Sequence, residues 1–176
     1  MRVLYISGSP RKNGNTDYLL KLCQSITGGD FIRLSDYQIE YCSYCGACIE
    51  KGVCTIEDDM TKIAEKLLKS QVIVLGSPVF FNNVSGQMKV FMDRTWPLRG
   101  NLKNKIGGAL VVGRKYGLES AINAINSFFL KHDMIVANRG VTAIAFDIGK
   151  VKEDGEAIES TEKLAKRIQE LNKFFS

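Results

Sequence analysis

The chain has 176 residues, with 24 Lys and Arg against 19 Asp and Glu, so its formal net charge is +5, and 45% of its residues are hydrophobic. A chain of this length and composition can bury a core of its own, which excludes disordered and fibrous classes and predicts a single domain over residues 1–176. The positive charge is mild and contains no Lys/Arg block, so a nucleic-acid partner is not expected.

Neither a membrane span nor a secretion signal is expected from the sequence. The longest stretch without a charged residue, residues 70–88, is interrupted by Gly, Pro and amide side chains. The apolar run at residues 2–6 is shorter than the core of a signal peptide and lacks a small-residue cleavage site. We therefore expect a cytoplasmic protein without a membrane partner.

The first half of the chain predicts two strands, one helix and a long loop. Residues 2–7 form a short apolar run that ends at a Gly and a Pro, which is typical of a buried parallel strand. A helix should begin near residue 15 or 16 and end at the Gly pair 28–29, followed by a second strand at 30–34. Residues 35–57 have no regular period and form a predicted cysteine-rich loop.

The second half alternates helices and strands. A helix beginning after Asp58 or Asp59 carries apolar residues at i, i+3, i+4, i+7 and i+8, and residues 71–76 are the clearest buried strand. The remaining elements are expected in this order: a helix at 85–96, a strand at 106–113, a helix at 118–131, a fifth strand within 134–146, and a helix at about 156–175.

Strands that alternate with helices predict an α/β fold in which a parallel sheet is covered by helices on both faces. Five strands favour the flavodoxin-like, doubly wound order. In that order a ligand lies outside the carboxyl ends of the strands at the topological switch point. The loops after the first, third and fourth strands are therefore expected to build the site.

The first of these loops, residues 7–16, has the composition of a phosphate-binding turn. It joins a strand to a helix and is rich in hydroxyl, amide and cationic side chains, with Gly8 and Gly14 permitting close approach of a ligand. Free N–H groups at a helix start favour an anion. The loop fits neither the Walker nor the dinucleotide-binding glycine pattern. The alternative is a plain turn with a capping Thr.

The loop after the third strand, residues 76–89, contains aromatic and amide side chains at the mouth of the predicted sheet. This mixture suits a flat, partly apolar ring system that also forms hydrogen bonds. The alternative is an ordinary apolar loop in which Ser85 caps the next helix.

Four of the five cysteines lie within thirteen residues, in the pattern C-x2-C-x2-C-x5-C at Cys42, Cys45, Cys48 and Cys54. Two adjacent x2 spacings let three sulfur atoms converge on one iron-sulfur cluster, and the fourth returns from a short loop. Zinc fits this spacing less well, and disulfides are disfavoured in a reducing compartment. A metal-free thiol loop remains an alternative. Cys23 lies on an apolar helical face and is expected in the core.

Three segments resemble the flavodoxin-like NADPH-dependent FMN reductase superfamily: residues 8–16, residues 76–80, and residues 85–89 followed by Asp93-Arg94. The resemblance implies that one loop holds the FMN phosphate and the second packs along the isoalloxazine ring. It implies phosphate contacts at Ser9, Arg11, Asn15 and Thr16, and ring contacts at Pro78, Val79, Phe80, Phe81 and Asn82. A third loop, 113–117, would lie at the other edge of the flavin and contribute Tyr116.

The resemblance also gives Asp93-Arg94 a role as a structural ion pair near a subunit contact, against the alternative of a solvated helix face. The cysteine spacing, placed just before the helix that starts at residues 58–60, resembles the iron-sulfur flavoprotein branch of the superfamily. That branch implies a 4Fe-4S cluster beside FMN, with Cys42, Cys45, Cys48 and Cys54 as its ligands.

The function implied is that of an FMN-dependent oxidoreductase. Electrons would pass from a one-electron donor, a ferredoxin, through the cluster to FMN and on to oxygen, peroxide or a quinone. No catalytic acid or base is required, and backbone amides of residues 78–82 would stabilise charge on the reduced flavin. We expect a homo-oligomer, a dimer or tetramer. The alternatives are a cluster-free NAD(P)H-dependent FMN or quinone reductase, and a zinc-stabilised or thiol redox-sensing binding module.

Overall fold

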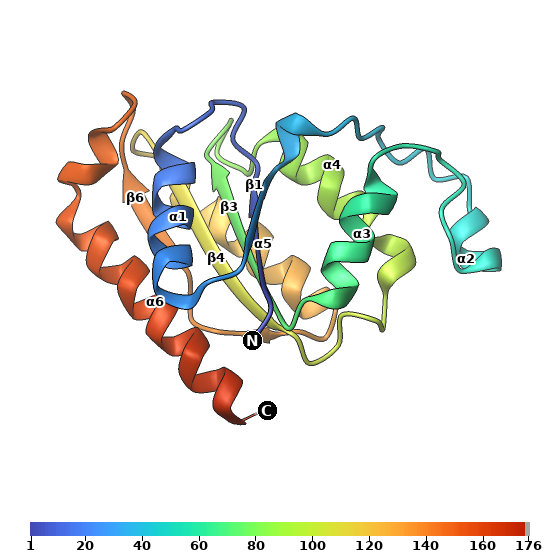
Figure 1. Ribbon diagram of the computed structural model, residues 1–176. Coiled ribbons are helices and arrows are strands. Elements are labelled where there is room, and N and C mark those ends of the chain that lie inside the picture. The colour runs from blue at the N-terminus through green and yellow to red at the C-terminus, as the bar shows by residue number, and fades with distance from the viewer. Residues whose placement is uncertain (175–176) are drawn as a thin grey trace.

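The computed structural model describes residues 1–174, and its strands form one parallel sheet (Figure 1). The strand order is β2-β1-β3-β4-β5, with β6 also paired to β4. This is the flavodoxin-like order, so the predicted fold class is confirmed. The strands are β1 (Val3–Ser7), β2 (Asp30–Arg33), β3 (Val72–Pro78), β4 (Ile106–Gly113), β5 (Ile135–Val136) and β6 (Val141–Ile144).

Helices lie on both faces of this sheet (Figure 1). The helices are α1 (Asn15–Thr27), α2 (Ala47–Lys51), α3 (Met60–Lys69), α4 (Gly86–Arg94), α5 (Leu118–Lys131) and α6 (Gly155–Phe174). Three short 3-10 turns accompany them: η1 (Leu34–Asp36), η2 (Trp96–Leu98) and η3 (Lys150–Glu153). The sequence predicted the longer helices, but it did not predict α2, which lies inside the cysteine-rich loop.

The core consists of two apolar layers, one on each face of the sheet. Successive residues of a strand point to opposite faces, so Val3 and Tyr5 pack against α1 and α6, while Leu4 and Ile6 pack against α3, α4 and α5. Cys23 on α1 is fully buried in the first layer, as predicted, and burial raises the pKa of its thiol to about 11.

The fifth strand is interrupted. The sequence predicted one strand within residues 134–146, whereas the structure has two short strands, β5 and β6, that pair in turn with β4. Gly140, between them, has a φ of 111°, and a Cβ atom there would lie 2.6 Å from Cδ1 of Ile122. The chain therefore leaves the sheet where α5 packs closely against it.

The last helix begins at Gly155, and its predicted inward residues Leu164, Ala165, Ile168 and Leu171 are all buried. The predicted end of this helix, Phe175, lies outside the described residues. No helix formed by residues 1–174 is both long enough and apolar enough to span a membrane.

Candidate functional site

A cavity of about 250 Å³ opens at the carboxyl ends of the strands, where the loops after β1, β3, β4 and β6 meet. Seven of the predicted cofactor-binding residues line it, and no acidic side chain of the described chain does. The lining residues are Ser9, Pro10, Arg11, Asn15, Thr16, Pro78, Val79, Phe80, Val112, Gly113, Arg114, Ala145 and Phe146.

The first loop is folded tightly by its own hydrogen bonds. The Ser9 Oγ atom accepts a hydrogen bond from the backbone N–H of Arg11 at 3.2 Å, and the Gly14 N–H donates to the Arg11 carbonyl at 3.2 Å. Gly14 is the N-cap of α1, and no side chain of the described residues caps that end. The first N–H groups of α1 are therefore available to an anion in the cavity.

The buried carboxylate of Asp17 stabilises this loop through hydrogen bonds. Asp17, which is fully buried, accepts hydrogen bonds from the Ser7 hydroxyl at 2.6 Å and from the Asn13 N–H at 2.9 Å. Arg33 donates to Asp17 through Nε at 3.1 Å and through Nη2 at 2.7 Å. Four donors thus neutralise one buried charge and connect β1, β2 and the loop.

Asn15 is already engaged in this structure. Its Nδ2 atom donates to the Asp147 carbonyl at 2.9 Å, and its Oδ1 atom accepts from the Gly149 N–H at 2.8 Å. The side chain thereby holds the segment after β6 against α1. The group that Asn15 offers to the cavity is its backbone N–H at the start of the helix.

Phe146 and Arg114 also line the cavity. Arg114 belongs to the loop 113–117 that the sequence predicted at the edge of the flavin, whereas Phe146 was not predicted. Arg11 donates to the Phe146 carbonyl at 3.2 Å, and the Phe146 ring centroid lies 6.0 Å from Cζ of Arg11 and 4.9 Å from Cζ of Arg114. Within residues 1–174 neither arginine forms an ion pair. The signal for Phe146 was topological, because a fifth parallel strand must also end at this edge.

The remaining predicted ring contacts lie beside the cavity rather than in its lining. Phe81 and Asn82 form the tip of a tight turn, with φ values of 47° and 59°, and the Phe81 side chain is fully exposed. Phe80 and Asn83 exchange backbone hydrogen bonds of 2.9 and 3.0 Å across it. Tyr116 is also exposed, and the adjacent Gly117 packs directly against Asn82.

Ser85 connects the first two loops. Its hydroxyl accepts from the Met88 N–H at 3.2 Å, which caps α4, and donates to the Gly8 carbonyl at 2.7 Å. The Ser85 N–H donates to the Ser77 Oγ at 2.9 Å. The capping role considered in the sequence is therefore present, and the same side chain also sets the spacing of the two loops.

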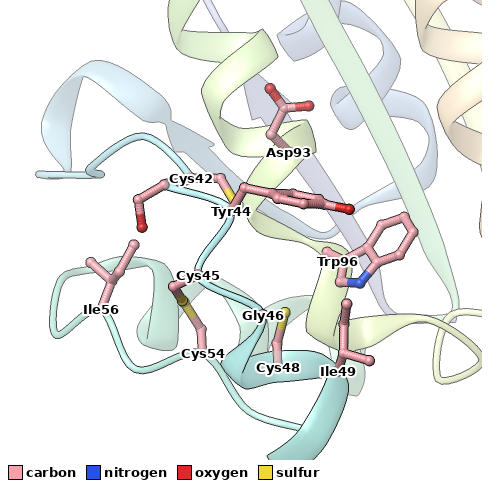
Figure 2. Close-up of a pocket in the computed structure, with 11 residues that line it drawn as sticks. Cys42, Tyr44, Cys45, Gly46, Cys48, Ile49, Cys54, Ile56, Asp93 and Trp96 are labelled. Carbon is pink, nitrogen blue, oxygen red and sulfur yellow. The ribbon is translucent and has the colours of Figure 1, made fainter.

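A second cavity, of about 350 Å³, lies in the cysteine loop (Figure 2). Cys42, Cys45, Cys48 and Cys54 all line it, together with Asp93 and Trp96 among others. All four thiols are free. Hydrogen bonds from the backbone of Ala47 and then from the Thr55 side chain lower the pKa of the Cys45 thiol.

The side chains around this cavity are of the kind that binds a metal or cluster through thiolates. Four cysteine side chains around one cavity are the ligands that an iron-sulfur cluster requires. Within the described chain, however, no three His, Cys, Asp or Glu side chains are arranged to hold a metal ion. The sulfur atoms would have to move closer together on binding.

The cysteine loop is closed at its base by carboxylates. Asp58 accepts hydrogen bonds from the Glu40 N–H and the Met60 N–H, each at 2.9 Å. Asp59 accepts from the Gln38 N–H at 2.9 Å. Because these contacts join residues 38–40 to residues 58–60, all four cysteines lie between two fixed points.

The expected Asp93-Arg94 ion pair is not formed. Lys89 pairs with Asp93 at 2.5 Å on the exposed side of α4, whereas Arg94 points inward and pairs with Asp58 at 2.5 Å. Adjacent residues on a helix point in different directions and do not face each other. Burial alone would raise the pKa of Asp58, but hydrogen bonds from Arg94, Glu40 and Met60 lower it below its usual 3.8.

The two cavities lie in different parts of the molecule. Among the described residues, none lines both of them. The cysteine loop with α2 extends away from the sheet, on the right of Figure 1. The first cavity is lined by residues at the carboxyl ends of the strands.

Comparisons with known proteins agree with this architecture. The model of the family described as NADPH-dependent FMN reductase matches residues 1–149. An iron-sulfur flavoprotein of Methanocaldococcus jannaschii is 40% identical over 189 positions that cover 98% of each chain. An iron-sulfur flavoprotein of Methanosarcina thermophila is 32% identical, covering 96% of this chain and 93% of its own. The crystal structure of RosB has the same fold, with a TM-score of 0.81 at 14% identity over 99% of this chain and 79% of RosB.

Proposed function

The chain belongs to the NADPH-dependent FMN reductase family and, within it, to the iron-sulfur flavoproteins, and we propose that it transfers electrons from a one-electron donor to a small acceptor. It is an FMN-dependent oxidoreductase. The proposal adds a 4Fe-4S cluster held by the cysteine loop, a ferredoxin as the donor, and oxygen, peroxide or a quinone as the acceptor.

In the proposed holoprotein, FMN occupies the cavity at the carboxyl ends of the strands and supplies redox chemistry in one- or two-electron steps. Its phosphate would lie at the start of α1, near the Ser9 and Thr16 hydroxyls and the Arg11 guanidinium. Among the described residues, two arginines without an ion-pair partner and no acidic side chain line the cavity, which gives it a positive potential that suits a dianion.

The ring would lie along Pro78, Val79 and Phe80. The N–H groups of Val79 and Phe80 already donate to the carbonyls of Val112 and Asn83. Among the described residues, the N–H groups of Phe81 and Asn82 at the tip of the turn have no such partner. These two amides are therefore the ones placed to stabilise negative charge on the ring, an electrostatic role that a change of side chain would leave largely in place.

The observation that carries the two-centre proposal is that all four cysteines of one short loop line one cavity. A cluster there would supply single-electron exchange. Each acceptor takes up two electrons and two protons: oxygen becomes hydrogen peroxide, a quinone becomes a hydroquinone, and hydrogen peroxide is cleaved at its O–O bond into two water molecules. Two single-electron deliveries from the donor therefore balance each turnover. A group that accepts electrons one at a time and donates them in pairs is therefore required, and a flavin has this property.

We also propose a dimer or tetramer. The cysteine loop extends away from the cavity of its own chain (Figure 1). In an oligomer, such a loop can approach the flavin of a neighbouring chain. A monomer in sedimentation equilibrium that keeps full electron transfer would contradict this part of the proposal.

The test is the flavin, iron, acid-labile sulfide and zinc content per chain of protein purified without oxygen. The proposal expects one FMN with about four irons and four sulfides, the content of a cubane on four thiolates. The fourfold variant with Cys42, Cys45, Cys48 and Cys54 changed to Ser should keep FMN and lose iron and sulfide. Wild-type protein that contains FMN but takes up no iron under anaerobic reconstitution would overturn the cluster proposal.

The second candidate is a cluster-free reductase in which a nicotinamide reduces FMN by hydride transfer. The match to a family described as NADPH-dependent favours it. Anaerobic mixing distinguishes the two functions. Rapid bleaching of the flavin by NADPH, in the wild type and the fourfold Ser variant alike, would support the reductase, whereas bleaching by reduced ferredoxin that depends on the cysteines would support the two-centre protein.

A further inference from the structure

Arg94 lies where the last turn of α4 meets the base of the cysteine loop. Its side chain is 2% exposed, so the guanidinium is removed from solvent. A buried guanidinium needs partners for its N–H groups, since each unpaired group loses its hydrogen bonds to water. The partners that Arg94 has, and the one that it lacks, define what it can do.

Its two terminal nitrogens are occupied. Nη1 donates to Asp58 Oδ2 at 2.5 Å and to the Glu40 carbonyl at 2.6 Å, and Nη2 donates to Asp58 Oδ1 at 3.1 Å. Glu40 precedes the first cysteine by two residues, and Asp58 follows the last by four. Arg94 thus contacts both ends of the loop from a rigid helix.

Its third donor is unoccupied. Within residues 1–174, the buried Nε–H of Arg94 has no hydrogen-bond partner. Burial would lower the pKa of Arg94, but the hydrogen bonds and charge of Asp58 raise it, and the charge of the Cys54 thiol and its side-chain contact with the guanidinium add to that rise. Because Cys54 interacts with this guanidinium and also lines the cavity, the unpaired Nε–H is the donor available to its sulfur when the sulfur atoms are drawn together.

We infer that Arg94 is a positioning residue for the cysteine loop: it holds the two ends of the loop together and donates its Nε–H to the Cys54 sulfur when that sulfur binds a metal or a cluster. The inference rests on the proposed thiolate site. Hydrogen bonds to ligand sulfur are one of the means by which proteins set the potential of a cluster, and partners of metal ligands contribute strongly to metal affinity.

The test uses Co²⁺ bound to the cluster-free protein, because its thiolate charge-transfer absorption reports binding without any activity measurement. The variant R94K keeps the positive charge but replaces the guanidinium and its Nε–H. We expect a loss of Co²⁺ affinity of at least about tenfold. The matched control is R167K, the same change at an exposed arginine on α6 whose partner is Glu170. It should bind Co²⁺ as the wild type does.

A double-mutant cycle shows whether Arg94 acts through Cys54. In a C54S background the R94K change should cost much less affinity than in the wild type, because the acceptor sulfur is already gone. Equal losses in both backgrounds, or a wild-type affinity in R94K, would overturn the inference. Circular dichroism checks that each variant is folded.

If R94K does not fold, the wild-type protein still answers the question. In its Cd²⁺ complex, the Arg94 Nε–H proton should exchange slowly with solvent in NMR spectra and should exchange faster in the metal-free protein. The same exchange rate in both states would overturn the inference. Anaerobic reconstitution of the wild type tests the cluster itself separately, so a failure to take up iron would overturn the proposed function and leave the Arg94–Cys54 result standing.

Discussion

Arg94 and Asp58 form a buried ion pair, with Nη1 of Arg94 2.5 Å from Oδ2 of Asp58 and side-chain exposures of 2% and 5%. The pair joins α4, which is packed against the sheet, to the segment just before α3, where Asp58 also accepts the N–H of Met60, the first residue of that helix. Because Asp58 also accepts the Glu40 N–H, the pair closes the cysteine loop as well as fixing α3. The loop therefore depends on a contact that lies outside its own sequence.

The variant D58N should be strongly destabilised. It removes the charge partner of Arg94 and leaves a buried guanidinium uncompensated, which typically costs about 3–5 kcal/mol. Urea unfolding followed by circular dichroism measures the loss. E159Q, which breaks an exposed pair with Lys163, is the control and should unfold like the wild type. A D58N protein as stable as E159Q would contradict the burial argument.

The same carboxylate gives a pH dependence. The pKa of Asp58 is below its usual 3.8 in the folded protein, so its stabilising contribution is fully present above pH 3.8. That contribution disappears as the pH falls through the folded-state value, because the unfolded chain takes up the proton first. We expect the unfolding free energy of the wild type to fall below pH 4 more steeply than that of D58N. Parallel profiles in urea titrations between pH 6 and pH 3 would contradict this.

The network below the first loop predicts an effect on ligand binding as well as on stability. D17N leaves Arg33 with only the half-exposed Asp36 as its charge partner and weakens the acceptor for the Asn13 N–H. We expect a loss of about 3 kcal/mol of stability, the low end of the cost of breaking a buried ion pair, because Arg33 keeps Asp36. We also expect weaker FMN binding, because the loop is no longer held in shape. D30N, at an exposed position on β2, is the control. FMN affinity is measured by flavin fluorescence titration. A folded D17N protein that binds FMN as tightly as the wild type would show that the Asp17 hydrogen bonds are not needed for FMN binding.

Seven of the residues that the sequence assigned to the cofactor line one cavity, because their signals are local. A strand that ends in a Gly-rich turn and continues into a helix places the residues of that turn, such as Ser9 and Arg11, at the carboxyl edge of the sheet wherever the chain folds this way. Phe146 was missed because it follows the interrupted strand, whose end could not be located from the pattern of residues 134–146.

The environment of the cysteine loop could not be predicted in the same way. The partner of Arg94 is 36 residues away, and nothing in the residue pattern distinguishes an inward-pointing arginine from an outward-pointing aspartate at the end of α4. Spacing indicated that the cysteines share a role. It did not indicate a helix between Gly46 and Gly52, where both glycines take left-handed conformations with φ of 80° and 71°.

The two cavity arginines should be distinguishable by their dependence on the phosphate. If Arg11 contacts the phosphate of FMN, R11Q should lower FMN affinity by tenfold or more, about 1.4 kcal/mol, and leave riboflavin affinity unchanged. R114Q tests the second cation in the same way. K12Q is the control, since Lys12 is exposed and does not line the cavity. If R11Q loses the same affinity for FMN and for riboflavin, the Arg11 guanidinium contacts the flavin ring or maintains the conformation of the loop, and does not bind the phosphate.

Phe81 combines an exposed ring with a strained backbone, and two substitutions separate these properties. Its φ is 47° and its side chain is fully exposed, so the ring packs on no other side chain of residues 1–174. F81A and F81G both remove the ring, but only Gly adopts a left-handed conformation without strain, a difference of about 1 kcal/mol. We therefore expect F81G to be more stable than F81A by that amount. If the ring covers the flavin, both variants should bind FMN more weakly, and to the same extent. The strained backbone at Phe81 would then be explained by FMN binding, because a glycine at this position would raise the folding stability but lower the FMN affinity. Unchanged FMN affinity in both variants would instead assign the ring to a contact outside the cofactor site.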